Sequence, residues 1–279
     1  MVTGSNRITT RAEFIDSALE STPAEESSLS IFHSGNGLSF CLYHKASGKI
    51  LLLVDYEHDG SSDTGMELLQ QFNETFGKYI LSWETDTYTW VPKELFNEKD
   101  VPSIAQKMLG KTDVQWTIID ELEAVLIHST IPPVLERMAE SLPAVTALPR
   151  PASSALALHR FWKTKPGEHV NIHVRSGALD ILAFSNGKLI LQNTYETDSI
   201  EDQLYFLTYA YEQLKFSPEE VPLKVSGDIV EGDRLWKTYQ KYIRNVGWLG
   251  SVSNLKPSAS IPTAAINQYA SLVHLAACE

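Results

Sequence analysis

Acidic side chains alternate along one short segment, and this spacing could hold a divalent cation. The segment reads Asp55-x-Glu57-x-Asp59-Gly60-Ser61-x-Asp63, which matches the first positions of an EF-hand calcium loop. The closing carboxylate belongs where Met66 stands, and a strand rather than a helix is predicted before the segment. We interpret it as a solvated acidic loop between a strand and a helix, with a weak cation site as the alternative.

Gly110-Lys111-Thr112 resembles the end of a phosphate-binding P-loop. The motif needs an earlier glycine, at the position where Ala105 stands, and a strand before the loop. Residues 102–109 instead have the pattern of a helix, so we expect Gly110 to be its C-terminal cap. The eight histidines show no paired metal-ligand spacing, and no Gly-x-Ser-x-Gly elbow marks a serine hydrolase. These motifs therefore predict neither a catalytic group nor a metal ligand.

Composition places the chain among ordinary globular proteins. It has 279 residues, of which 43% are hydrophobic and 21% charged, and its net charge is −12. The excess of acid argues against nucleic acid or an anionic membrane as the main partner, and no apolar run is long enough for a membrane-spanning helix. Residues 1–16 lack the apolar stretch of a secretory signal, and only Cys41 and Cys278 are present. We therefore expect a soluble cytoplasmic protein.

An internal duplication supplies the elements that must position any site. Residues 29–42 and 170–183 each have the pattern of a strand, a glycine-containing turn and a second strand. A third strand follows in both copies, and then a helix with a capping motif at its start, Thr64-x-x-Glu67 in the first copy and Ser199-x-x-Asp202 in the second. The offset between the copies changes only in the turns, which predicts a duplicated βββα unit.

After each of these helices the pattern continues as strand, helix, strand, helix. We expect these elements at 124–129, 133–140, 144–148 and 153–165 in the first copy, and at 222–226, 233–244, 247–249 and 263–276 in the second. Residues 79–119 have no counterpart and are interpreted as an insertion. A domain boundary near Gly167 gives a first domain at 1–167 and a second at 168–279. Each is an α/β unit of the form βββαβαβα, with a mixed sheet flanked by helices.

This duplicated arrangement resembles the actin-like ATPase superfamily, of ribonuclease H-like fold, which includes actin, sugar kinases and Hsp70 chaperones. More closely, the chain is similar to an uncharacterised bacterial family, domain of unknown function 3822, found mainly in Bacteroidetes and assigned that fold. The segments that carry the closer resemblance are 88–96, 193–196, 200–214, 225–228 and 242–245. The resemblance covers nearly the whole chain.

The resemblance also implies where a nucleotide would bind. Active members of the superfamily place Asp-x-Gly in the first hairpin turn of each domain, where the glycine lets the backbone approach phosphate and the carboxylate holds water or Mg²⁺. Here the turns read His33-Ser34-Gly35 and Arg175-Ser176-Gly177, without the aspartates, and the Gly-Gly of the adenosine side reads Ser226-Gly227-Asp228. The residues implied for a nucleotide or another anion are Ser34, Gly35, Asn36, Gly37, Arg175, Ser176, Gly177, Ser226, Gly227 and Asp228.

Because both aspartates are missing, we expect a non-catalytic actin-like protein that serves as an interaction or regulatory module for an unknown protein partner. One alternative is an ATP-dependent enzyme of the superfamily that binds ATP or ADP and holds Mg²⁺ with other carboxylates, such as Asp180 or Asp228. The other is a protein that binds an anionic metabolite through the glycine turns and Arg175, whose guanidinium can donate two hydrogen bonds to one anion.

Overall fold

Two units make up the fold, and the chain passes between them more than once. The computed structural model describes residues 8–35, 37–57 and 62–279. The first unit contains the chain up to Ser154 together with Ser253–Pro262 and Ser271–Glu279, and the second contains Ala155–Val252 and Thr263–Ala270. The division into domains at 1–167 and 168–279 stays a prediction.

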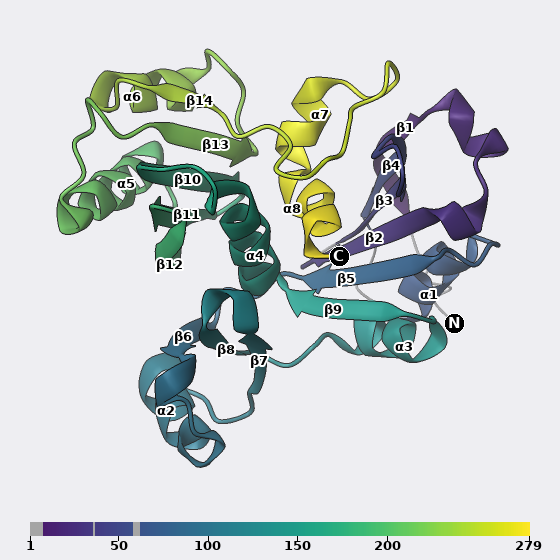
Figure 1. Ribbon diagram of the computed structural model, residues 1–279, viewed down its shortest axis with the longest axis horizontal. Helices are drawn as coiled ribbons and strands as arrows, with labels where there is room; N and C mark the ends of the chain where they lie inside the picture. The colour runs from purple at the N-terminus through teal and green to yellow at the C-terminus, as the bar shows by residue number, and fades with distance from the viewer. Residues whose placement is uncertain (1–7, 36, 58–61) are drawn as a thin grey trace, which may run out of the picture. The chain divides into compact units, whose positions relative to one another are not determined.

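The first unit is built on a six-stranded mixed sheet in the order β1-β4-β3-β2-β5-β9 (Figure 1). Strands β2, β3 and β4 are antiparallel neighbours, β1 pairs antiparallel with the outer edge of β4, and β5 and β9 run parallel to β2. Helices α1 and α3 pack on one face and contribute apolar side chains to its core. The bounds are β1 Thr9–Ile15, β2 Ser27–Ser34, β3 Gly37–His44, β4 Ile50–Glu57, α1 Ser62–Gln70, β5 Lys78–Trp83, α3 Pro133–Ser141 and β9 Val145–Pro149.

A small three-stranded sheet, in the order β6-β8-β7, is added to the first unit. Helix α2 covers it through a core that includes Val101, Ala105 and Ile127. We expected 124–129 to continue the repeat, but β8 belongs to this added sheet. Strand β5 takes the expected place instead, because it lies parallel to β2 as β13 lies parallel to β10. The bounds are β6 Tyr88–Pro92, α2 Val101–Leu109, β7 Gln115–Ile119 and β8 Ala124–His128.

The second unit contains a five-stranded mixed sheet in the order β12-β11-β10-β13-β14 (Figure 1). Helices α5 and α6 pack on one face of this sheet and complete its core. The bounds are β10 Glu168–Arg175, β11 Ala178–Ser185, β12 Lys188–Glu196, α5 Ile200–Leu214, β13 Leu223–Gly227, α6 Arg234–Tyr242 and β14 Val246–Trp248. Helix α4, Arg150–Trp162, precedes this sheet, and α7, Thr263–Gln268, and α8, Ala270–Val273, follow it.

Matching positions of the two copies face the two cores, which confirms the duplication. Alternate residues of the first hairpin point toward α1 and α3, and their counterparts 141 positions later point toward α5 and α6. The matched core residues are Leu29, Ile31, Leu38, Phe40 and Leu42 in the first unit and Val170, Ile172, Leu179, Ile181 and Ala183 in the second. The residues between them therefore lie on the opposite face of each sheet.

Some helix ends follow the capping rules. Ser199 caps α5, accepting a hydrogen bond from the backbone N–H of Asp202, and Gly110 ends α2 in the left-handed conformation. The cap predicted at Thr64 is wrong, since α1 begins at Ser62 and Thr64 is buried inside it. Short 3₁₀ helices lie at Ser17–Ser21, Ala24–Glu26, Lys93–Leu95, Glu98–Asp100, Asp120–Leu122 and His274–Cys278. In the described ranges, every helix lacks the combined length and apolar character needed to cross a membrane.

Candidate functional site

The first hairpin turn joins β2 to β3. Ser34 and Gly37 close the ladder opposite each other, and Asn36 lies outside the described residues. The backbone N–H of Gly35 donates a hydrogen bond to Glu84 Oε2 at 3.2 Å. Since Glu84 follows directly after β5, the chain brings one of its own carboxylates to an N–H group of this turn.

The second hairpin turn joins β10 to β11, and its arginine is engaged in an ion pair. Arg175 Nε lies 3.1 Å from Asp180 Oδ2, and Nη2 lies 3.3 Å from Oδ1, so the two groups meet side by side. The side chain of Arg175 is 12% exposed and that of Asp180 is 3% exposed. Gly177 has a positive φ of +74° and open space where a Cβ would stand. The turn is accessible, but its arginine already binds a carboxylate.

Asp180 belongs to a row of polar side chains that crosses four strands of the second sheet. Its neighbours in register are Thr194 on β12 and His173 on β10, and Ser226 on β13 lies beside His173. Thr194 Oγ1 donates to Asp180 Oδ1 at 2.6 Å. Ser226 Oγ donates to the carbonyl of Ile172, so it accepts a hydrogen bond from the N–H at His173 Nδ1, 3.0 Å away. The fold thus brings Arg175 and Ser226, both predicted site residues, to one polar row.

The first unit has an equivalent ion pair in a different arrangement. Asp55 on β4 binds Arg11, with its Oδ2 3.0 Å from Nε and its Oδ1 3.1 Å from Nη2, and Ser39 Oγ donates to Asp55 Oδ1 at 2.8 Å. A Cβ at Gly37 would overlap the backbone carbonyl of Tyr56 on β4 as well as the Arg11 guanidinium, so this position needs glycine for a packing reason. The repeat offsets place Ser39 on Asp180 and Asp55 on Thr194. Carboxylate and hydroxyl have therefore exchanged strands between the copies.

Packing also explains the third predicted segment, Ser226-Gly227-Asp228. Gly227 has a φ of +93°, and a Cβ there would overlap the backbone of Val174 on the neighbouring strand. The N–H of Asp228 donates to the carbonyl of Val174 at 2.8 Å. This close approach of two backbones requires a glycine whether or not a nucleotide binds.

The acidic segment between β4 and α1 behaves differently from a calcium loop. Asp55 is held by Arg11, and Asp63 Oδ1 lies 2.9 Å from Arg137 Nη1, while Asp59, Gly60 and Ser61 lie outside the described residues. Within the described ranges, no three His, Cys, Asp or Glu side chains gather as a metal site.

Burial raises the pKa of the Cys41 thiol to about 12, which keeps this residue protonated at neutral pH.

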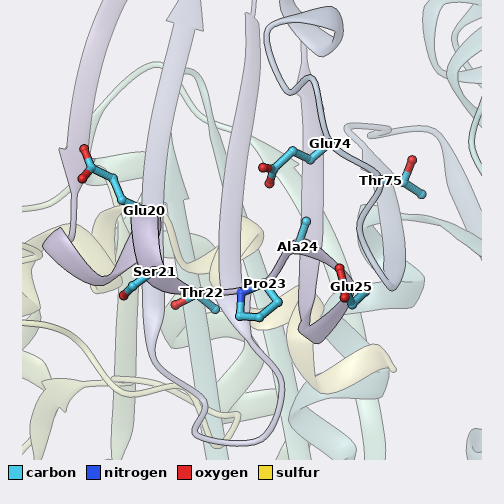
Figure 2. A pocket seen from close by; sticks show the side chains of 8 residues that line it. All are labelled: Glu20, Ser21, Thr22, Pro23, Ala24, Glu25, Glu74 and Thr75. Atoms are coloured by element: carbon cyan, nitrogen blue, oxygen red, sulfur yellow. The ribbon is translucent and has the colours of Figure 1, made fainter.

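A hollow of about 580 Å³ lies on the surface of the first unit, at the end of β2 remote from the hairpin turn. Figure 2 shows Glu20, Glu25 and Glu74 among its lining side chains. The predicted nucleotide or anion residues are absent from this lining. Three carboxylates would repel a phosphate, so the hollow does not add to the predicted site.

Sequence reasoning missed the two ion pairs. From the sequence we expected Asp55 in a solvated acidic loop, with a weak cation site as the alternative, and Asp180 as a Mg²⁺ ligand only for the enzyme alternative. Both carboxylates instead bind arginines. A signal was present in the duplication, because the offsets that align the strands also align each hydroxyl with a carboxylate. The arginines could not be found this way, since Arg11 lies on β1, which has no counterpart in the second sheet.

The comparisons with known proteins identify the fold. A family described as "Protein of unknown function (DUF3822)" matches residues 16–246. A Bacteroides thetaiotaomicron protein with an actin-like ATPase fold and unknown function aligns with a TM-score of 0.67 and 23% identity, over 80% of this chain and 90% of that chain. A PilM-PilN type IV pilus biogenesis complex contains a chain with a TM-score of 0.59 and 12% identity, over 92% of this chain and 98% of its own. No curated protein matches. The actin-like ATPase fold expected from the sequence is confirmed.

Proposed function

The chain belongs to DUF3822, a family of proteins of unknown function, and on this basis we propose that it is a non-catalytic protein of the actin-like ATPase fold that works as an interaction or regulatory module. The observation that carries the proposal is the ion pair between Arg175 and Asp180 beside the second hairpin turn. The resemblance to the actin-like ATPase superfamily implies that its active members carry a carboxylate in that turn, where the carboxylate can face Mg²⁺.

The chemistry of this pair opposes a metal site. Arg175 supplies a fixed positive charge where Mg²⁺ would need negative charge, and Asp180 accepts hydrogen bonds from both Arg175 and Thr194. A cation that took Asp180 would break its pair with Arg175, and breaking a buried ion pair typically costs about 3–5 kcal/mol. The Arg11–Asp55 pair constrains the first unit in the same way.

Two further observations support the interaction role. The added sheet carries exposed apolar side chains on its edge strand β7, where Trp116 is 39% and Ile118 is 47% exposed. PilM, a protein of similar fold, has been solved in a complex with PilN, so this fold can serve in protein assembly. Cys41 and Cys278 are buried and are not joined in a disulfide, which suits the reducing cytoplasm where we place the protein.

Isothermal titration calorimetry with ATP, ADP and inorganic phosphate, with and without Mg²⁺, tests the proposal together with a phosphate-release assay. We expect no Mg²⁺-dependent heat of ATP binding and no phosphate release above the buffer rate. The matched variant is Arg175→Ala, which removes the guanidinium and leaves Asp180 hydrogen-bonded to Thr194. If a weak anion site existed at the turn, phosphate binding by the wild type would disappear in this variant.

Mg²⁺-dependent ATP binding by the wild type, with phosphate release that Asp180→Asn abolishes in a folded variant, would overturn the proposal. Circular dichroism spectra that match those of the wild type establish that each variant is folded. Phosphate binding that ignores Mg²⁺ and needs Arg175 would instead favour the anionic-metabolite alternative.

A further inference from the structure

Another hollow, of about 510 Å³, lies on the surface of the first unit, where helices α1 and α3 both end. Leu69 and Gln70 of α1 line it together with Ser141 of α3, and Tyr79 at the start of β5 also contributes. We call it the α1–α3 hollow. Ser34 stands at the other end of the neighbouring strand β2, so the hollow is remote from the predicted nucleotide or anion residues of this unit. A cavity of this volume is of the size that takes a small organic molecule.

The floor of the α1–α3 hollow is apolar. Leu69 and Tyr79 are 7% and 3% exposed, and both belong to the core of the first unit. Phe72 and Leu142 also line the hollow and pack half-buried against that core. The hydroxyl of Tyr79 accepts a hydrogen bond from the N–H of Phe76 at 3.0 Å, which ties the segment between α1 and β5 to the strand. An apolar stem that covers this floor removes carbon surface of both partners from water, which stabilises its binding.

The rim of the hollow is electronegative. The last carbonyl groups of a helix have no partner within the helix, and the helix dipole gives that end a partial negative charge. Both α1, which ends at Gln70, and α3, which ends at Ser141, bring this end to the hollow. Among the described residues that line it, Glu74 carries the only formal charge. The helix ends and this carboxylate together repel an anion and attract a cation.

The hollow of about 580 Å³ adjoins the α1–α3 hollow and has the same sign of charge. Glu74 and Thr75, which Figure 2 shows in the lining of this larger hollow, line both, and Glu20 and Glu25 line the larger one. We propose that the α1–α3 hollow binds a small organic cation, a primary ammonium on an unbranched apolar stem. The stem covers the floor, and the ammonium donates hydrogen bonds to Glu74 and to carbonyl oxygens at the helix ends. The binding is independent of the proposed function, since neither a nucleotide nor a protein partner takes part in it.

Titration of the ¹⁵N-labelled full chain with hexylamine, followed by NMR, tests the proposal, because this amine is protonated at neutral pH as the lysine side chain is. We expect the amide signals of Gln70, Thr75 and Ser141, which line the hollow, to shift together with a Kd of about 0.1–10 mM. Butylamine has two methylenes fewer and should bind about tenfold more weakly. Hexanoate has a stem of similar length and a negative charge, so it should leave the three signals unchanged.

Two lysine variants separate the local charge of the rim from the net charge of the chain. Thr75→Lys places a competing ammonium at the rim and should weaken hexylamine binding at least about tenfold. Thr112→Lys is the matched control, because it changes the net charge equally at an exposed threonine before β7, outside the lining of both hollows. It should leave the Kd within about twofold of the wild type. Both threonines are exposed, and circular dichroism spectra check that both variants fold.

Equal affinities for butylamine and hexylamine would overturn the proposal, since the apolar floor would then contribute nothing. Equal weakening by the two lysine variants would do the same, because the amine would then respond only to net charge. The last probe is Nα-acetyl-lysine amide, whose side chain has the stem of butylamine. We expect it to bind no more tightly than butylamine does. Binding more than about tenfold tighter would assign the hollow to a lysine of a protein partner and would overturn the small molecule as its occupant.

Discussion

Ser39 and Asp180 occupy the same position in the two repeats, yet one is a hydroxyl and the other a carboxylate. Each is hydrogen-bonded to the residue opposite it on the next strand, Asp55 or Thr194, which supplies the complementary group. In both units the carboxylate stands on the strand adjacent to the one that carries the arginine. The position of the arginine thus determines which strand holds the acid.

Removing the charge of Asp180 should destabilise the protein strongly. Asp180→Asn breaks the largely buried ion pair with Arg175, so we expect a loss of about 3 kcal/mol in the free energy of unfolding, measured with urea. Glu201→Gln is the control, because it removes an exposed pair with Arg234 and should cost less than about 1 kcal/mol. Equal losses in the two variants would contradict a structural role for the buried pair.

Moving the carboxylate of the second unit to the strand used in the first should fail to restore stability. The double variant Asp180→Thr/Thr194→Asp copies the arrangement of Ser39 and Asp55, but Arg175 stays on β10, two strands away from β12. We expect the double variant to be at least as unstable as Asp180→Thr in thermal unfolding. Rescue to the wild-type melting temperature would show that the arginine does not fix the place of the acid.

Lowering the pH should loosen the added three-stranded sheet. Burial lowers the pKa of His128, partly offset by the hydrogen bond from Nδ1 to the carbonyl of Ser129, and its Nε2 accepts from Thr117 Oγ1. The unfolded chain takes up this proton at pH about 6.5, before the folded chain does, so stability falls as the pH drops below that value. The protection factors of the β7 amides, which correct the exchange rates for their intrinsic pH dependence, should therefore fall between pH about 7 and 5.

His128→Gln is the variant for that experiment, because glutamine cannot gain the proton. This variant should remove most of the pH dependence of amide protection at β7. Burial also lowers the pKa of His169, which stacks on Trp162 in the second unit and contributes to the overall stability in the same direction. Amide exchange at β7 reports on the added sheet, so it separates the effect of His128 from that of His169. An unchanged pH profile of β7 exchange in the variant would assign the effect elsewhere.

The two turn glycines should differ in their tolerance of a side chain. Gly227→Ala brings a Cβ against the backbone of Val174, so we expect a loss of more than about 2 kcal/mol in the free energy of unfolding. Gly177→Ala meets open space and should cost about 1 kcal/mol, from its positive φ alone. Similar losses at the two positions would mean that the tight contact at Gly227 is relieved by a small backbone shift.

The sequence predicted those parts of the fold that depend on neighbouring residues. Ser199 and the apolar spacing of α5 are local signals, and the repeat offset predicted which side chains face the two cores. Strand order is not local: 124–129 has a strand pattern, but only pairing decides that it joins the added sheet rather than the main one. The Arg11–Asp55 pair could not be predicted for the same reason. Its members lie 44 positions apart and meet because β1 lies beside β4.

The path of the chain has a consequence for biosynthesis. The last residues return to the first unit, where Glu279 accepts hydrogen bonds from Ser28 and Tyr43, and Lys256 pairs with Lys49. A ribosome releases Lys256 only after Ala155–Val252 of the second unit has been made, and Glu279 only after the whole second unit. The earlier part of the first unit therefore stays incompletely covered until Ser271–Glu279 has been synthesised, and during that interval it is a natural client for chaperones.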